Sequence, residues 1–114
     1  MKKYDVVIIG AGTAGLTARK EVEKKTKNYI VVDDGPLGTT CARVGCMPSK
    51  VLIQAANDYH RRYAHKKQGI HGELAINRKE TMEHVRSLRD RFVKGVKSSL
   101  PQWEDKLVRK RVRF

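Results

Sequence analysis

Cys41 and Cys46 are the residues whose type and spacing most directly suggest chemistry. They are the only cysteines among 114 residues, with four residues between them. A secreted, disulfide-stabilised domain of this size normally carries more bridges. A zinc site normally uses C-x2-C spacing or further ligands. The pair therefore suggests reactive thiols, and the plainer alternative is two unpaired thiols in a reducing compartment.

The spacing sets a condition on any bond between these two thiols. In a regular helix, residues five positions apart are roughly 8.5 Å apart at Cα, whereas a disulfide needs less than about 7 Å. If the cysteines pair, the segment between them cannot be regular helix, and Gly45 gives the backbone freedom for a close approach. Pro48 favours the first turn of a helix. That turn places Cys46 near a helix start, where a thiolate is stabilised.

A glycine-rich turn at residues 10–15 is the second feature that suggests chemistry. Its sequence, G-A-G-T-A-G, follows an apolar run and precedes a helical pattern, which is the context that a dinucleotide-binding turn needs. Gly10 permits the tight turn, Gly12 lets a pyrophosphate approach the backbone, and Gly15 lets the helix pack on the strand. The helix start then faces the phosphates.

An acidic residue is expected where the next strand ends. Asp33 lies 18 residues after Gly15, where a carboxylate can bind a ribose hydroxyl, and Asp34 is the neighbouring candidate. The glycine pattern alone does not separate NAD from FAD. A disulfide close to such a site suits FAD, because a flavin can exchange electrons with sulfur.

The secondary structure expected around these residues indicates an α/β fold built on a Rossmann-like βαβ unit. The apolar runs at 4–9 and 30–32 are typical of buried parallel strands, with a helix at 16–25 between them. Two further helices, at 48–62 and 78–100, and a terminal strand at 107–114 complete the predicted order, with a loop at 65–77. The second of these helices has an apolar stripe that we expect to be core. The stripe comprises Met82, Val85, Leu88, Phe92, Val93 and Val96.

Charge and hydropathy exclude several classes of function. The chain carries 25 Lys and Arg against 12 Asp and Glu, but no nucleic-acid-binding motif accompanies the charge, so we expect no nucleic-acid partner. No apolar run is long enough to span a membrane, and the first residues do not form a signal peptide. A cytoplasmic setting follows, and it favours a catalytic disulfide over a structural one. The four histidines have no metal-binding spacing, so no metal site is expected.

The segment from Gly38 to Lys50, G-T-T-C-A-R-V-G-C-M-P-S-K, closely resembles the redox-active segment of the flavin disulfide reductases. With Gly10 to Gly15 and Asp33, the resemblance covers the whole chain in order. It is most similar to the dihydrolipoyl dehydrogenases; glutathione and mercuric reductases share the same skeleton. The family usually has a second glycine where Thr39 stands and often an asparagine where Arg43 stands.

The resemblance implies a role for each matching residue. Cys41 would be the thiol that meets the substrate, and Cys46 would be the flavin-side thiol, in charge-transfer contact with oxidised FAD. Lys50 would lie near the flavin ring. The other implied FAD-binding residues are Gly10, Gly12 and Gly15 for the pyrophosphate, Asp33 for the adenosine ribose, Gly38, Thr39 and Thr40 for the linker side of the flavin, and Val112, by its backbone, for the adenine.

The resemblance also implies that residues 1–114 are the N-terminal part of an FAD-binding domain, with the NAD-binding and interface domains absent. The intact enzyme would be a homodimer that takes electrons from a small dithiol or a lipoyl domain and passes them to NAD. Another flavin disulfide reductase, or a stand-alone FAD-binding module without catalysis, is the alternative. Since the resemblance places the NAD-binding and interface domains outside these residues, we expect residues 1–114 alone to be inactive. The expected strand at 107–114 has no predicted partner within the chain, so we also expect marginal stability.

Overall fold

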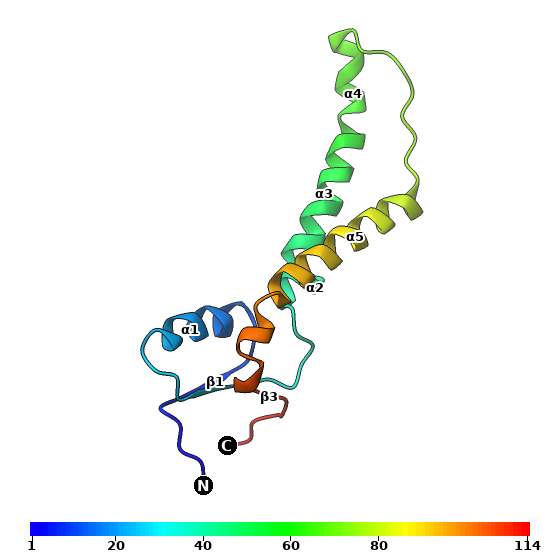
Figure 1. The fold of residues 1–114 in the computed structure, drawn as a ribbon. Helices are drawn as coiled ribbons and strands as arrows, with labels where there is room; N and C mark the ends of the chain where they lie inside the picture. Colours follow the sequence, from blue (N-terminus) through cyan, green and yellow to red (C-terminus); the bar gives the residue numbers. More distant parts are fainter. The chain divides into compact units, whose positions relative to one another are not determined.

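The computed structural model describes residues 1–114, which divide into two compact units. The first comprises residues 1–40 and 93–114 and contains all the strands; we call it the sheet unit. The second comprises residues 41–92 and contains only helices and loops; we call it the helical unit. Figure 1 labels helices of both units and the strands β1 and β3 of the sheet unit.

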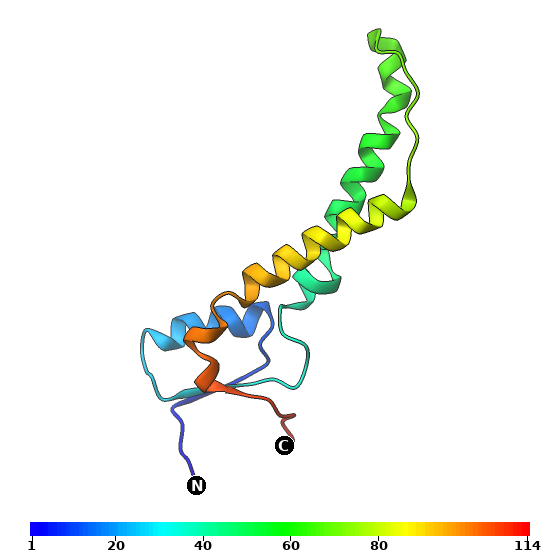
Figure 2. The same ribbon diagram turned by 45° about the vertical axis from the view of Figure 1, so that its right-hand side comes forward.

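The sheet unit is built on a parallel three-stranded sheet in the order β1-β2-β3. Its strands are β1 (Val6–Ile9), β2 (Tyr29–Val32) and β3 (Leu107–Val108). Helix α1 (Thr13–Glu23) connects β1 to β2 and lies along the sheet in both ribbon views (Figures 1 and 2). The predicted α/β class and the βαβ unit are confirmed.

One face of this sheet carries the core. Its buried residues are Ile8, Ala11, Tyr29, Val31 and Trp103. Trp103 lies between the two 3-10 helices that precede β3, η2 (Leu100–Gln102) and η3 (Glu104–Lys106). Burial of these side chains supplies the main hydrophobic stabilisation of the unit.

A charged side chain is buried within the same core. Arg19 of α1 is only 5% exposed. Its Nη1 lies 2.5 Å from Glu23 Oε2 and donates a 3.2 Å hydrogen bond to Tyr29 Oη. The guanidinium lies 5.1 Å from the Trp103 ring centroid, within range of a cation–π contact. The hydrogen bond from Arg19 holds the pKa of Glu23 below its usual value. Arg19 thus joins α1, β2 and the segment before β3.

Two expectations about the strands are wrong. The opposite face of β1 is not buried, because Val7 and Ile9 are 51% and 56% exposed. An apolar run shows that the side chains of a strand favour burial. Both faces are buried only where a second layer covers the strand. The terminal strand is restricted to Leu107–Val108 instead of 107–114, and it has a partner, since Leu107 and Val108 pair with Val31 and Val32 of β2.

The helical unit begins within α2 (Thr40–Val44) and continues with α3 (Cys46–His60), α4 (Arg62–His65), the 3-10 turn η1 (Lys66–Gln68) and most of α5 (Arg78–Lys97). The two predicted long helices are confirmed with shifted ends. The loop expected from residue 65 begins later, since η1 extends to Gln68 and Gly69 ends it with φ +75°.

The apolar stripe of α5 was expected to be core, and most of it is not. Val85 alone is buried, and Met82 is 38% exposed. Helix α3 has no buried residue. An amphipathic pattern identifies the apolar side of a helix without identifying what covers it.

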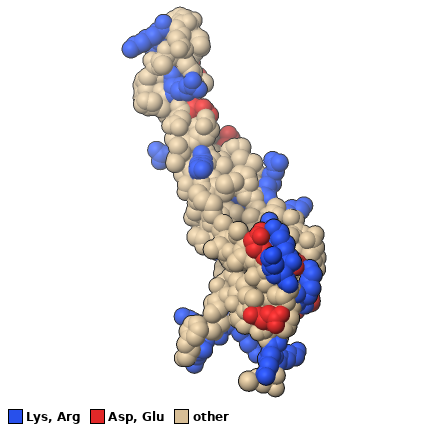
Figure 3. All heavy atoms as spheres, turned by 90° about the vertical axis from the view of Figure 1, so that its left-hand side faces the viewer, with Lys and Arg blue, Asp and Glu red and all other residues tan.

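No helix of the structure combines the length and the apolar character needed to cross a membrane. On the face shown in Figure 3, basic side chains are scattered, with acidic side chains among them.

Candidate nucleotide-binding turn and redox disulfide

The glycine turn connects β1 to α1 and has the backbone geometry that the sequence predicts. Gly10 has φ +98°, a conformation that favours glycine. A Cβ built on Gly15 would lie 1.8 Å from the carbonyl oxygen of Gly10, so only glycine permits this approach of α1 to the turn. A Cβ on Gly12 would meet nothing within 4 Å. The backbone at Gly12 is therefore open to a ligand.

Asp33 follows β2 directly, and its carboxylate turns toward the glycine loop. Oδ2 accepts a 2.6 Å hydrogen bond from the Ala11 backbone N–H, and Oδ1 accepts one of 2.7 Å from Gly35 N–H. The neighbouring candidate, Asp34, has no such contact and is exposed. The structure thus brings Asp33, of the two acids, to the turn.

These residues fit the adenosine and pyrophosphate part of a dinucleotide. The N-terminal end of α1 has no side-chain cap, so its first N–H groups are available to an anion. The open backbone at Gly12 leaves room for a phosphate, and the Asp33 carboxylate offers an acceptor to a ribose hydroxyl. FAD and NAD share this part, so the fit concerns the dinucleotide and not the flavin.

The helical unit contains a disulfide between Cys41 and Cys46, with their Cα atoms 5.0 Å apart. Cys41 lies in α2 and Cys46 is the first residue of α3, with Gly45 between the helices. The break at Gly45 therefore brings the pair closer than one continuous helix allows. Ser49 secures the new helix, because its N–H and hydroxyl both donate to Gly45 O.

The position of Cys46 agrees with the sequence-based expectation of a thiol at a helix start. Pro48 is the third residue of α3, within its first turn. A thiolate formed at Cys46 on reduction would be stabilised by the N–H groups and the dipole of this 15-residue helix. Cys46 is exposed and Cys41 is half-buried. The unequal roles of the two thiols remain a prediction.

Residues 4–110 match the family model described as pyridine nucleotide-disulphide oxidoreductase. The chain belongs to this family. Over 95 residues it is 36% identical to the dihydrolipoyl dehydrogenase of Corynebacterium glutamicum, covering 82% of this chain and 20% of that protein. The corresponding enzyme of Mycoplasma pneumoniae is 35% identical over 97 residues, covering 83% of this chain and 21% of that protein.

A mercuric reductase of Streptomyces lividans is 40% identical over 57 residues, which cover 50% of this chain and 12% of that protein. The chain spans about a fifth of the length of the dihydrolipoyl dehydrogenases that it matches. The match to the pyridine nucleotide-disulphide oxidoreductases therefore concerns one segment of much longer proteins.

One departure from the expected sequence lies at a left-handed backbone position. Thr39 stands where a second glycine is usual, and its φ is +62°, following Gly38 with φ +111°. Both are buried, and Thr40 begins α2. A left-handed conformation costs a β-branched residue free energy that glycine avoids, which accounts for the glycine expected at this position.

Lys50 lies on α3, one turn after Cys46, and is exposed. It lines a hollow of about 520 Å³ within the helical unit together with side chains from α3 and α5. Val112 is half-buried and lies four residues beyond the end of β3, not within a strand. The flavin-side roles of Lys50, Gly38, Thr39, Thr40 and Val112 remain predictions.

Sequence reasoning missed one charged residue beside Asp33. Arg109, directly after β3, lies with its Nη1 3.6 Å from Asp33 Oδ1. The only sequence signal was its place in a basic run, Arg109-Lys110-Arg111. The structure brings together no group of three or more His, Cys, Asp or Glu side chains that could hold a metal ion.

Proposed function

We propose that this chain is the FAD- and disulfide-bearing part of a dihydrolipoyl dehydrogenase-like oxidoreductase, which passes electrons from a dithiol through Cys41 and Cys46 and FAD to NAD. The observation that carries the proposal is the disulfide formed across the break between α2 and α3. The family match over residues 4–110 and the names of the relatives support a lipoyl-type dithiol as the substrate.

The chemistry of the protein residues is thiol–disulfide exchange. One substrate thiolate attacks Cys41 Sγ, the bond between the cysteines breaks, and Cys46 leaves as a thiolate. The second substrate thiolate attacks the substrate sulfur of the mixed disulfide, and Cys41 leaves. The substrate dithiol is thereby oxidised to a disulfide and the protein disulfide is reduced by two electrons. The start of α3 favours Cys46 as the leaving group because it stabilises the thiolate.

FAD, when bound, supplies a two-electron acceptor for the reduced pair and a donor to NAD. Gly10, Gly12 and Gly15 would hold its pyrophosphate and Asp33 its adenosine ribose. Gly38, Thr39, Thr40, Lys50 and the Val112 backbone would contact the remaining parts. The proposed partners are a small dithiol or a lipoyl domain and a second copy of the intact subunit.

A mercuric reductase-like enzyme is the second candidate, favoured by the 40% identity to the Streptomyces lividans protein. Assay of the intact protein with dihydrolipoamide and NAD, and separately with mercuric ion and NAD(P)H, distinguishes the two. The proposal expects turnover with the dithiol. Turnover with mercuric ion alone would replace it by the second candidate.

The unequal roles of the cysteines are tested by substitution in the intact, FAD-containing protein. Alkylation after reduction is expected to label Cys41 first. Cys46→Ser should abolish the long-wavelength absorbance of a thiolate against flavin, and Cys41→Ser should keep it. The reverse pattern would show that the two thiols exchange roles. A protein that stays colourless after FAD addition would contradict the cofactor assignment.

The 114-residue chain alone is expected to show no dihydrolipoamide–NAD activity and to be marginally stable. The chain corresponds to about a fifth of its relatives, and the apolar side chains of Val7 and Ile9 are exposed. Thermal unfolding combined with that assay tests both statements. A cooperative, monomeric and active chain would contradict its interpretation as one part of a larger enzyme.

A further inference from the structure

The register of the sheet places a basic side chain beside the acid at the nucleotide-binding turn. Val31 pairs with Leu107 and Val32 with Val108, so the next positions along the two parallel strands are Asp33 and Arg109. The Asp33 N–H donates to Val108 O at 3.1 Å and maintains this alignment one step beyond the ladder. Both residues therefore lie at the carboxyl end of the sheet, where ligands of α/β folds bind.

The guanidinium of Arg109 contacts the turn after β2 at two points. Nη2 donates a 2.6 Å hydrogen bond to Gly35 O, and Nη1 lies 3.6 Å from Asp33 Oδ1. The Asp33 side chain is 18% exposed and that of Arg109 is 46% exposed. Arg109 thus connects the end of β3 to the loop that carries Asp33.

The two carboxylate oxygens of Asp33 have different partners. Oδ1 faces both the Gly35 N–H and the guanidinium, whereas Oδ2 accepts from the Ala11 N–H at the glycine turn. A carboxylate oxygen can accept about two hydrogen bonds. Oδ1 is therefore held by the hydrogen bond from the Gly35 N–H and by the charge of Arg109, which at 3.6 Å is an ion pair longer than a hydrogen bond. Oδ2, which the guanidinium does not face, keeps acceptor capacity beside the glycine turn.

We propose that Arg109 is a positioning residue for nucleotide recognition: it fixes the Asp33 carboxylate so that Oδ2 is presented to a ribose hydroxyl. This inference rests on the proposed dinucleotide site at Gly10 to Gly15. Arg109 acts through Asp33 and does not itself bind the ribose. Because its guanidinium is already engaged by Gly35 O and Asp33, no preference for a 2′-phosphate is expected.

Recognition of the hydroxyl is measured by amide chemical-shift titration of the 114-residue chain, kept folded with the stabilising osmolyte TMAO, with ADP and with 2′,3′-dideoxy-ADP. Wild type should bind ADP roughly tenfold more tightly than the dideoxy analogue, the order expected for a hydrogen bond to a charged group. Arg109→Met should reduce this ratio to about threefold or less. Without Arg109 the Asp33 carboxylate is free to move, and it must lose conformational entropy when it binds the ribose hydroxyl. Affinity for the dideoxy analogue should change little, which separates this role from a general loss of structure.

Four further variants sharpen the result. Arg111→Met removes an exposed charge from the same run and should keep the full ratio, so it controls for charge. Asp33→Asn should reduce the ratio of the two affinities to about one, and adding Arg109→Met to this variant should have no further effect on the ratio. Should Arg109→Met fail to give a folded amide spectrum, Arg109→Gln keeps a donor for Gly35 O and serves in its place, with the same expected loss.

An unchanged ratio in a folded Arg109 variant would overturn the inference and leave the dinucleotide site intact. Failure of folded wild type to bind either nucleotide would contradict the proposed function, and the inference with it. Tighter binding of adenosine 2′,5′-bisphosphate than of ADP would show that Arg109 binds phosphate, which also overturns the positioning role.

Discussion

The sheet unit and the helical unit are stabilised in different ways. Six of the eight buried hydrophobic residues belong to the sheet unit: Ile8, Ala11, Tyr29, Val31, Val32 and Trp103. The helical unit buries only Ala42 and Val85. Its internal contacts include the Cys41–Cys46 disulfide and the Arg62 guanidinium, which lies 3.7 Å from the centroid of the Tyr59 ring and 4.0 Å from that of Tyr63.

The two units should therefore be sensitive to different perturbations, one to changes in packing and the other to reduction. The sheet unit depends on close packing, so a change of one methyl group at the right position disrupts it. The helical unit depends on a covalent bond that reduction opens, so its local stability should follow redox state. The unit that contains the glycine turn is therefore the one held together by packing, and the unit that contains the two cysteines is the one whose stability should depend on their oxidation state.

The largest expected effect is in the sheet unit, from Gly15→Ala. The added Cβ would lie 1.8 Å from Gly10 O and 2.9 Å from Gly10 C, and a backbone clash cannot be relieved by a side-chain rotation. We expect a loss of more than about 3 kcal/mol of unfolding free energy. Because the 114-residue chain is expected to be marginally stable, urea denaturation is carried out in the stabilising osmolyte TMAO and followed by the fluorescence of Trp103, the single tryptophan.

Gly95→Ala is the matched control, because the same added atom on α5 meets nothing within 4 Å. It should be neutral or stabilising by up to about 1 kcal/mol. Equal losses for the two variants would show that the contact between α1 and the turn does not explain the effect of Gly15→Ala.

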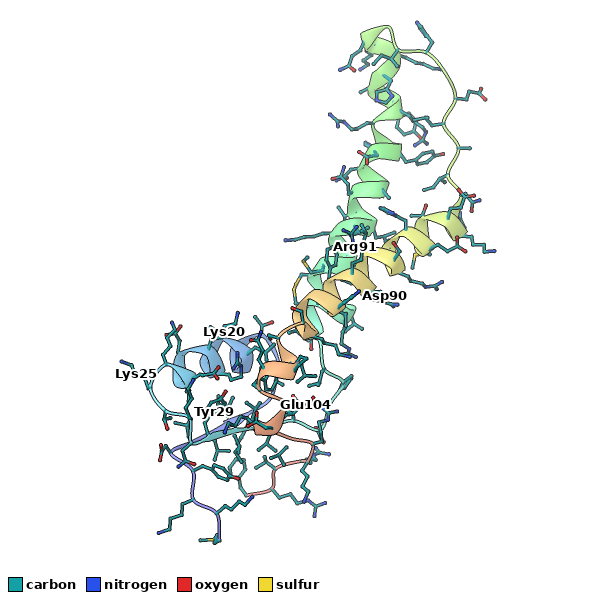
Figure 4. The ribbon with its side chains drawn as sticks, in the orientation of Figure 1. Lys20, Lys25, Tyr29, Asp90, Arg91 and Glu104 are labelled. Atoms are coloured by element: carbon teal, nitrogen blue, oxygen red, sulfur yellow. A yellow bond between two sulfur atoms is a disulfide. The ribbon has the colours of Figure 1, made fainter.

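The next effect concerns the buried Arg19. Arg19→Ala should destabilise the sheet unit by about 2 to 3 kcal/mol, because it removes the partner of Tyr29 Oη and the packing against Trp103. Arg19→Met keeps the stem and should cost less. Lys20→Ala is the control, since Lys20 points away from the sheet on α1 (Figure 4). A shift of Trp103 fluorescence in the Arg19 variants but not in Lys20→Ala would place the change at the contact between Arg19 and Trp103. An equal loss of stability in Lys20→Ala would contradict the role given to Arg19.

Reduction of the disulfide should act on the helical unit. Loop-closure entropy for a ring this short gives about 2 kcal/mol of local stabilisation. Amide hydrogen exchange in α2 and the first turn of α3 should therefore accelerate on reduction, while exchange in β2 stays slow. A Cys41→Ser, Cys46→Ser double variant should reproduce the reduced pattern. Uniform acceleration across β1 and β2 as well would show that the two units do not respond separately.

The sequence predicted those features that backbone sterics or bond lengths dictate. Gly15 could be predicted because no other residue lets α1 approach the turn. The break between Cys41 and Cys46 could be predicted on the condition that the two cysteines pair, because a disulfide has a short reach. Arg109 could not be predicted, because its position beside Asp33 depends on the register of β3 against β2. The exposure of Val7 and Met82 was missed because a pattern of apolar residues does not reveal what covers them.

The smallest expected effect concerns Asp5, the residue of the sheet unit that directly precedes β1. Its carboxylate accepts hydrogen bonds from Thr26 Oγ1 at 2.6 Å and Asn28 Nδ2 at 3.0 Å, and these lower its pKa from the ordinary value of 3.8. A depressed folded-state pKa contributes stability above the unfolded value, and this contribution is lost as pH falls through the folded one. Asp5→Asn should therefore lower stability slightly at pH 7 and flatten the decline in stability below about pH 4. Urea midpoints between pH 2.5 and 7 measure this, with the exposed Glu73→Gln as control. An unchanged decline in Asp5→Asn would show that the Asp5, Thr26 and Asn28 contacts do not hold the carboxylate in its charged form.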